Sequence, residues 1–528
     1  MVRLKITFAG ALALGLALSP CAQAADQLTL RRANGAEPSS LDPQLISGDW
    51  EGHIIDDLFE GLMTRSADGR NIPGVATSWE VSDDGTVYTF HLRPDEKWSD
   101  GQPVTAGDFV YAWRRMLDPS LAADYAYMLY PVKHAKAVNQ GDRPASELGV
   151  EAVDAHTFKV TLERPTPYFL KLLSHYSTYP LPRHVVEKYG KDWTRPGHMV
   201  SDGAFELKEW APQSRIVATK NPYFHDADHV ALDRVIYYPI EDASSALKRF
   251  RAGGVDTTST VPAAQVQWAR QHLPDALRIA PQLGSYYYDF NLRAGSKLTD
   301  KRIRQALNLA VRRQVITDKI LGMGQIPAYG FVPSSISDYD GVAFGFEDQP
   351  MAARMEKAKA LMNAAGYGPD HPLDLTISYN TLEDHKKIAV AIAAMWKPLG
   401  VNVKLANSEA AVHFANLQTG KFEVGRYGWL ADYDDAENFL ALFKTGVANN
   451  YAGYHNPAYD ARLDQAAQTL DPTQRQAMLE RAERMLLDDY ALLPLYFYVS
   501  AHLVSPALDG WQDNANDAHL SRWIDFKQ

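Results

Sequence analysis

Cysteine is almost absent from this sequence. Cys21 is the only one among 528 residues, so the chain by itself forms neither a disulfide nor a multi-cysteine metal site. If the first 24 residues are cleaved off, the remaining 504 contain no cysteine, and a cysteine nucleophile is excluded as well. A chain of this length buries most of the surface that its unfolded form exposes, so we expect the core alone to hold the fold.

Long hydrophobic runs are also missing, apart from one at the N-terminus. A basic start is followed by apolar and small residues at 6–18, which is well short of the roughly 20 residues that span a bilayer as a helix. The sequence Ala-Gln-Ala at 22–24 matches a signal-peptidase site, so we expect a cleaved secretory signal over residues 1–24 and a periplasmic protein. Lipidation at Cys21 is the alternative, but Pro20 stands where a lipobox requires a small residue.

The short motifs that mark common enzymes are absent. We find no G-x-S-x-G, Walker A loop, H-E-x-x-H or dinucleotide fingerprint. The best metal candidate is the pair His225 and His229, but Asn221 and Pro222 just before it favour an exposed polar loop. We therefore expect a protein that is not an enzyme and carries neither cofactor nor metal. A secreted hydrolase or peptidase is the alternative.

Positive charge is in deficit, whereas tyrosine is abundant. The net charge is -11, and -13 without the first 24 residues, which disfavours contact with nucleic acid or anionic membranes. We expect a monomer with no nucleic-acid partner. The 27 tyrosines either pack in ordinary cores or line a large cavity that needs polar tips on apolar walls.

Local patterns mix strands and helices along the whole chain, which predicts an α/β or α+β fold. Residues 86–92 alternate apolar and polar side chains, as a half-buried strand does. Thr105 and Asp108 form a capping-box pattern that starts a helix. Further helices are predicted after Asp300 and over 352–365 and 472–487, and a buried strand is predicted over 492–499.

Seven segments carry a family resemblance. The most specific block runs from Trp98 to Val110, W-S-D-G-x-P-V-T-A-x-D-F-V, and includes the helix start just described. The others lie in the same order along the chain, at 37–43, 57–62, 221–222, 306–307, 379–381 and 428–433. Together they resemble the periplasmic oligopeptide- and murein-peptide-binding proteins of ABC importers, which belong to family 5 of the extracellular solute-binding proteins.

The resemblance implies an α/β fold of two lobes with an extra third domain and a ligand enclosed between the lobes. Domain I would be discontinuous, at about 25–59, 183–283 and 500–528. Domain II would cover 60–182, and domain III 284–499. The implied function is to capture short peptides and deliver them to the membrane permease of an ABC importer, with closure of the lobes around the ligand.

The resemblance also implies how the amino-terminal end of a peptide is held. Asp432 matches the aspartate that binds the terminal ammonium, which needs a carboxylate once it leaves water. Gly428 and Trp429 would lie on a strand that pairs with the ligand backbone. Ser47 and Asp49 would belong to the segment on the opposite side.

Other residues are implied at the far end of the ligand and in the cavity walls. Arg426 and His385 match residues that approach the ligand carboxylate, although a structural ion pair and a surface helix position are the alternatives. Tyr125, Tyr287 and Tyr498 match cavity tyrosines, with core packing as the alternative.

Five positions depart from the family pattern. Leu321 stands in place of a lysine at the ligand carboxylate, Ala410 in place of a pocket tryptophan and Leu417 in place of a pocket arginine. Gly284 and Leu430 occupy the positions of the family's disulfide. Recognition of a free carboxylate is therefore open, and a non-peptide solute such as a sugar, metal chelate or bile acid is the alternative ligand.

Overall fold

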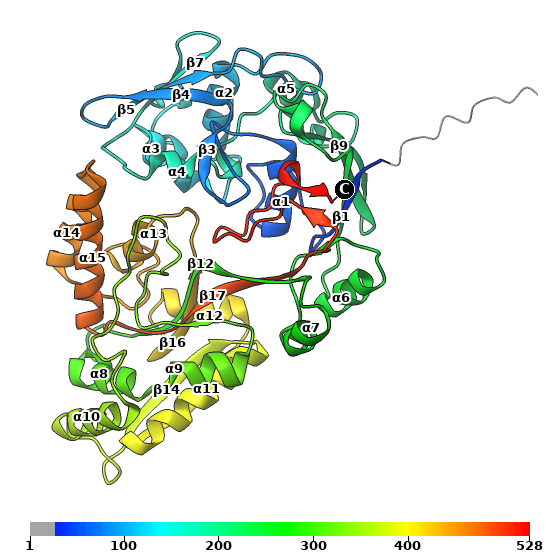
Figure 1. The fold of residues 1–528 in the computed structure, drawn as a ribbon. Coiled ribbons are helices and arrows are strands. Elements are labelled where there is room, and N and C mark those ends of the chain that lie inside the picture. Colours follow the sequence, from blue (N-terminus) through cyan, green and yellow to red (C-terminus); the bar gives the residue numbers. More distant parts are fainter. Residues whose placement is uncertain (1–26, 528) are drawn as a thin grey trace, which may run out of the picture.

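The structure is a computed structural model that describes residues 27–527. Three larger sheets with helices packed around them confirm the expected mixture of strands and helices. Figure 1 shows an upper body, a lower body and two long strands, β12 and β17, that run between them. The predicted secretory signal lies outside the described residues.

The helices follow one another along the chain as α1 (Asp49–Leu58), α2 (Ala106–Met116), α3 (Ala135–Asn139), α4 (Phe169–Leu172), α5 (Arg183–Tyr189), α6 (Ala243–Arg251), α7 (Val266–His272), α8 (Lys301–Ala310), α9 (Arg313–Val315), α10 (Met351–Ala364), α11 (Glu383–Trp396), α12 (Ala410–Gln418), α13 (Glu437–Leu440), α14 (Pro457–Gln468) and α15 (Pro472–Asp488). The predicted helix starts are confirmed. Thr105 and Asp108 form the capping box of α2, and the side chains of Asp300 and Asp471 cap α8 and α15. In the described part of the chain, no helix is long and apolar enough to cross a membrane.

A five-stranded sheet joins segments from distant parts of the sequence. Its order is β11 (Thr257–Thr258), β1 (Thr29–Ala33), β10 (Arg234–Tyr238), β9 (Arg215–Lys220) and β8 (Phe205–Ala211). Strand β1 pairs in parallel with both β10 and β11, so the start of the chain is held between segments some 200 residues away.

A four-stranded antiparallel sheet lies in the upper body, in the order β4 (Ala76–Val81), β5 (Val87–Leu92), β7 (Thr157–Thr161) and β6 (Val150–Ala152). The alternation predicted at 86–92 is confirmed, because Tyr88, Phe90 and Leu92 are the buried side chains of β5. Two small antiparallel pairs of strands complete this half of the molecule. They are β2 (Met63–Arg65) with β3 (Asn71–Pro73), and β18 (Leu508–Asp509) with β19 (Asp525–Phe526).

The lower body is built on a six-stranded sheet. Its order is β13 (Ile326–Pro327), β17 (Leu492–Leu503), β12 (Leu277–Phe290), β16 (Val424–Leu430), β14 (Leu373–Asn380) and β15 (Val401–Ser408). It has its own apolar core, separate from the core that the two other large sheets share.

Strands β12 and β17 pair with each other over almost their whole length and connect the lower body to the five-stranded sheet. The pairing shifts register twice, between Pro281 and Ser285 and between Tyr286 and Tyr287. The domain boundaries expected from the family resemblance remain a prediction; what is established is which strands each sheet contains.

Candidate ligand-binding cleft

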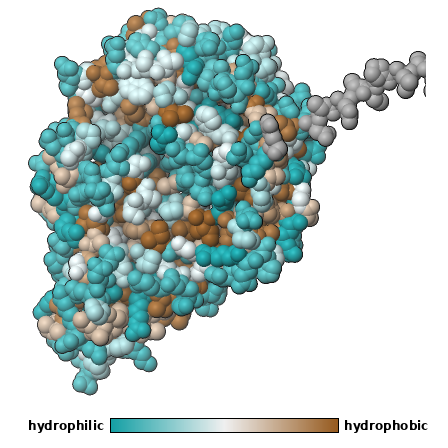
Figure 2. Space-filling model, viewed as in Figure 1, coloured by the Kyte–Doolittle hydropathy of each residue, from teal (hydrophilic) through white to brown (hydrophobic). Residues whose placement is uncertain are grey.

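A cavity of about 520 Å³ lies beside the ends of β1 and β11 in the five-stranded sheet and of β16 in the six-stranded sheet. It is lined by the start of α1, by aromatic residues of the upper body, by the end of β16 and by the C-terminal segment around Asp517. Figure 2 shows apolar side chains at the surface in a band between the upper and lower bodies, over strands β12 and β17 of Figure 1. A pocket of this size with mixed walls suits a small organic ligand.

Asp432 lines this cavity, two residues after the end of β16. The side chains of Tyr127 and Asn438 lie next to its carboxylate, and its backbone N–H donates to Asn438 Oδ1 at 3.3 Å. Loss of water around it raises the pKa of the Asp432 carboxyl. Among residues 27–527 no cation lies within ion-pairing distance of it, so Asp432 presents a fixed carboxylate without a positive partner.

Tyr125 also lines the cavity, as expected. Its ring belongs to an aromatic group with Tyr127, His175 and Tyr176, with ring centroids 4.6 to 5.8 Å from its own. Burial and the charges of Asp432 and Asp49 raise the pKa of the Tyr125 hydroxyl, which therefore stays protonated at neutral pH. Sequence reasoning missed Tyr127 and Tyr176, which carry no motif of their own.

Strand β16 presents a second group of the expected residues on one face of the six-stranded sheet. Arg426 lies opposite Tyr288 of β12, and Gly428 lies opposite Tyr286. The Arg426 guanidinium donates to the Tyr498 hydroxyl at 3.0 Å and stands over the ring of Tyr286, 4.6 Å from its centre. Arg426, Gly428 and Tyr498 are all half-buried, so this face is accessible beside the cavity.

His385 lies at the start of α11 beneath this face. It is buried, and its Nδ1 is 3.1 Å from the Tyr286 hydroxyl. Burial, and then the charge of Arg426, lower the pKa of His385 to about 3. The ring is therefore neutral at physiological pH, and Arg426 is the one of this pair that supplies positive charge.

Tyr287 requires a correction. Neighbouring residues of a strand point to opposite faces, and Tyr287 points away from Arg426 into the core of the lower body, where its ring packs against Phe331 and Tyr427. It is 1% exposed and does not line the cavity. Tyr286 takes the position beside Arg426 instead.

Trp429 shares the Tyr287 side of the sheet, because it lies next to Gly428 in the strand. Its ring N–H donates to Asn438 Oδ1 at 2.7 Å, which orients the amide that contacts Asp432. Trp429 therefore acts on Asp432 indirectly, by orienting Asn438, and it does not itself line the cavity.

The segment on the opposite side lies at the start of α1. Gly48 is the N-terminal cap, and Glu51 accepts from the backbone N–H groups of Ser47 and Gly48. Asp49 and the adjacent Trp50 line the cavity, whereas Ser47 is exposed outside it.

The five departures from the family pattern differ in their surroundings. Leu321 and Leu417 are buried, and Ala410 is exposed at the first turn of α12. Gly284 and Leu430 are direct cross-strand partners. A Cβ at Gly284 would come 2.5 Å from Leu430 Cδ2, so the leucine side chain occupies the space above the glycine.

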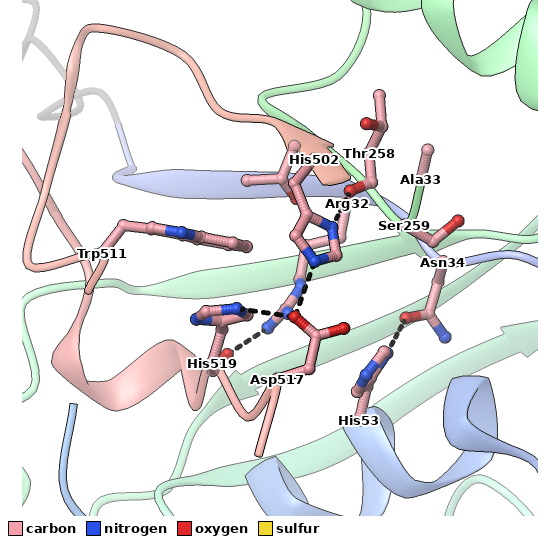
Figure 3. A pocket seen from close by; sticks show the side chains of 11 residues that line it. Arg32, Ala33, Asn34, His53, Thr258, Ser259, His502, Trp511, Asp517 and His519 are labelled. Carbon is pink, nitrogen blue, oxygen red and sulfur yellow. Dashed lines mark hydrogen bonds and ion pairs between the residues drawn. The ribbon is translucent and has the colours of Figure 1, made fainter. Parts of the chain in front are cut away.

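A cluster that the sequence did not reveal lies behind the cavity. Figure 3 shows His502 and His519 turned toward the carboxylate of Asp517, at 2.7 and 3.3 Å. Among residues 27–527 this is the group of His and acidic side chains whose atoms lie close enough for a shared ion. Arg32 also lines this space and donates to the backbone oxygen of His519 at 2.8 Å. Its charge opposes a metal ion there, and the cluster is satisfied as an ion-paired network.

The prediction that His225 and His229 lie in an exposed polar loop also requires a correction. His229 is exposed and pairs with Asp226, as a polar loop predicts. His225 is not exposed: its side chain is 10% accessible and its Nε2 lies 3.1 Å from Glu60. This contact could not be predicted from sequence, since 165 residues separate His225 from Glu60.

Replacement of Gly428 by alanine is expected to weaken ligand binding about tenfold or more. The new methyl group would lie 2.6 Å from the Tyr498 hydroxyl and 3.3 Å from Arg426 Nη2, so it would crowd the face of β16 that a ligand would contact, and a steric misfit of this size costs about 1–3 kcal/mol. Titration calorimetry with the ligand that the wild type binds measures the loss. Gly345→Ala is the matched control, because a Cβ there meets nothing within 4 Å. Equal affinity of the wild type and Gly428→Ala would exclude this face from the binding site.

Comparison with known proteins shows which family the chain resembles. Residues 71–451 match the family model described as bacterial extracellular solute-binding proteins, family 5 Middle. The chain is 41% identical to the periplasmic oligopeptide-binding protein OppA of Salmonella typhimurium, over 93% of this chain and 90% of that protein. It is 38% identical to the probable deoxycholate-binding periplasmic protein YgiS of Escherichia coli, over 92% and 91% of the two chains.

Among solved structures, the chain resembles the murein tripeptide-binding protein MppA in its unliganded open form. The TM-score is 0.87 at 38% identity, over 95% of this chain and 98% of that one. The expected α/β fold of two lobes with an extra domain is thereby confirmed. The matches extend along nearly the whole described chain, and on this basis the protein belongs to the family 5 extracellular solute-binding proteins.

Proposed function

We propose that this protein is a non-enzymatic periplasmic receptor that captures short peptides by their free amino terminus and delivers them to the permease of an ABC importer. The observation that carries the proposal is Asp432, a carboxylate in the cleft with no cation partner among the described residues. A peptide ammonium that leaves water needs such a partner. Tyr127 and Asn438 lie next to the carboxylate, and Asn438 accepts a hydrogen bond from the backbone N–H of Asp432.

The backbone of β16 supports the same conclusion. Strand β14 pairs with it only at Val424 and Gly425, whereas β12 pairs with it from Val424 to Leu430. At residues 427–430, the edge of β16 that faces away from β12 therefore has no strand partner in the described chain. An extended peptide can pair with such an edge through its own N–H and C=O groups, whatever its side chains are. Gly428 leaves room for this close approach.

Export and delivery follow from the same proposal. A cleaved signal over residues 1–24 would carry the chain to the periplasm, where the named relatives OppA and YgiS reside. The chain resembles an open, unliganded structure, and we infer that its two lobes close on the peptide and that it acts as a monomer.

Native mass spectrometry of the protein purified from the periplasm tests the proposal. The expected result is a one-to-one complex with short peptides, and the masses released on denaturation identify them. Incubation with a defined peptide mixture should leave every peptide intact. Release of a bile acid or sugar would establish the alternative ligand class, and cleaved peptides would establish an enzyme.

A further inference from the structure

Tyr168 and Tyr433 form a contact between the two bodies that lies apart from strands β12 and β17. Tyr168 directly precedes α4 of the upper body, and Tyr433 directly follows Asp432 in the lower body. Their rings are stacked, with centroids 4.9 Å apart and planes 7° from parallel. The Tyr433 ring thereby packs against the apolar core of the upper body, although its chain segment belongs to the lower body. In Figure 1 this contact lies between α4 and α13.

Lys171 of α4 adds a charged contact to the same segment. Its Nζ donates to the backbone oxygen of Asp434 at 2.6 Å and lies 3.8 Å from Asp435 Oδ2. Within residues 27–527, Asp435 is the acid that lies at ion-pairing distance from Lys171, so this cation of the upper body is partnered across the boundary. A hydrogen bond from a charged donor is stronger than a neutral one, and here it holds the main chain itself.

Arg475 of α15 holds the same segment from the lower body. Its guanidinium donates to both carboxylate oxygens of Asp435, at 2.7 and 2.8 Å. This bidentate arrangement fixes orientation as well as distance, and Asp435 is buried, so little water competes for the pair. The Arg475 guanidinium also lies 5.8 Å from the ring centre of Tyr168. Residues 433–435, the bridging segment, are therefore held by one cation from each body.

Asp432 immediately precedes the bridging segment and has neighbours in both bodies. Tyr127 of the upper body and Asn438 of α13 lie next to its carboxylate. A shift of the bridging segment away from α4 would carry Asp432 with it, because the two are joined directly in the chain. The position of the carboxylate relative to Tyr127 therefore depends on the contacts that cross the boundary.

We propose that Lys171 and Tyr168 are positioning residues for Asp432: they hold the bridging segment against the upper body, so that the carboxylate stays in place for the ammonium of the ligand. This inference rests on the proposed function, because it takes Asp432 as the partner of that ammonium. Neither residue lines the cavity, so both act through Asp432 and not on the ligand itself. A binding group is effective only when its surroundings hold it within about 0.5 Å of the productive position.

The test measures the binding of tri-alanine, both free and acetylated at its amino terminus, by titration calorimetry. In Lys171→Met we expect the free peptide to bind about tenfold more weakly, because a charged hydrogen bond behind its anchor is lost. Stopped-flow fluorescence should locate this loss in faster dissociation. Lys171→Arg, which can still donate to the Asp434 oxygen, should regain most of the affinity. The acetylated peptide should bind weakly and equally to the wild type and to both variants.

Further variants separate positioning from folding. Lys136→Met is the matched control, because Lys136 is an exposed lysine of α3 in the same body and forms no ion pair within residues 27–527. Tyr168→Leu removes the stacked ring but keeps an apolar side chain, so it should weaken binding of the free peptide as well. In Asp432→Asn, the added change Lys171→Met should cost little more, because the group that Lys171 positions is already disabled.

Unchanged affinity of folded Lys171→Met for the free peptide would overturn the positioning role. An equal loss for the free and the acetylated peptide would also overturn it, because the effect would then not pass through Asp432. If Lys171→Met does not fold, the same comparison of the two peptides in Tyr168→Leu decides. If tri-alanine does not bind the wild type at all, the proposed function itself fails, and the inference fails with it.

Discussion

Replacement of Asp432 by alanine is expected to abolish detectable binding of short peptides. Removal of one partner from a buried ion pair costs about 3–5 kcal/mol, which is roughly 100-fold to more than 1,000-fold in affinity. The fold should survive, because Asp432 lies beyond the end of β16 and forms no ion pair among the described residues. Titration calorimetry with the peptides identified in the native complex measures the loss.

The size-matched variant Asp432→Asn separates charge from shape, because it can still bond to Tyr127 and Asn438 but attracts an ammonium less strongly. Peptides acetylated at the amino terminus supply the complementary control. The wild type should bind them as weakly as Asp432→Ala binds the free peptides, and acetylation should make little further difference to the variant. Full affinity of Asp432→Ala, with a normal circular dichroism spectrum, would refute the amine anchor.

Much of the local structure could be predicted from sequence because its causes are local. The alternation at 86–92, the capping box of Thr105 and Asp108, and the cap at Asp471 each depend on residues within a few positions of one another. The family resemblance located Asp432 for a similar reason, since it rests on a contiguous block that ends β16.

The face of β12 could not be predicted in this way. Residues 286–288 are three consecutive tyrosines, so the alternation of side-chain types that usually distinguishes the two faces is missing. The pairing of β17 also shifts between Tyr286 and Tyr287. Only the register with β16, which sets Tyr286 opposite Gly428, decides which ring meets Arg426.

The charge state of the cleft could not be predicted from the sequence either. His385 was expected to help bind a carboxylate, but its burial beside Arg426 keeps it neutral, and this depends on contacts between α11 and two distant strands. Asp517, His502 and Arg32 come from the C-terminal segment, β17 and β1, and no sequence spacing indicates that they meet. The ligand selectivity of such a cleft is set by long-range pairings of this kind.

Replacement of His502 by glutamine is expected to destabilise the protein by about 1.5–3 kcal/mol near pH 6, because it removes the shorter of the two charged hydrogen bonds that Asp517 accepts from histidines. His502 donates to the backbone oxygen of Thr258 as well as to Asp517, so its imidazolium form satisfies both acceptors. It thereby ties β17 to β11 and to the C-terminal segment that lines the cavity. Urea unfolding followed by circular dichroism measures the difference.

The loss should depend on pH in a defined direction. Burial opposes the charge on His502, but Asp517 outweighs this and raises the pKa of His502 above 6.5. The pKa of Asp517 lies well below 3.8, chiefly because His502 overcomes its desolvation. A histidine whose pKa is raised by folding stabilises the fold fully at pH values below its unfolded pKa, and this stabilisation is lost as pH rises through its folded pKa. A carboxyl whose pKa is lowered by folding stabilises the fold fully at pH values above its unfolded pKa, and this stabilisation is lost as pH falls through its folded pKa. The difference between wild type and His502→Gln should therefore be largest between about pH 4 and 6.5 and shrink toward pH 9.

Other charged and titratable side chains surround His502 and Asp517, and the control variant must leave them unchanged. Arg32 of β1, His53 of α1 and His519 of the C-terminal segment all face it, and they remain in place in His502→Gln. His272→Gln is the matched variant, because His272 is an exposed histidine of α7 whose Nδ1 contacts only the backbone of its own helix. It should leave both the stability and its pH dependence unchanged. If the loss in His502→Gln were the same from pH 5 to pH 9, packing at β17 rather than the ion pair with Asp517 would be its source.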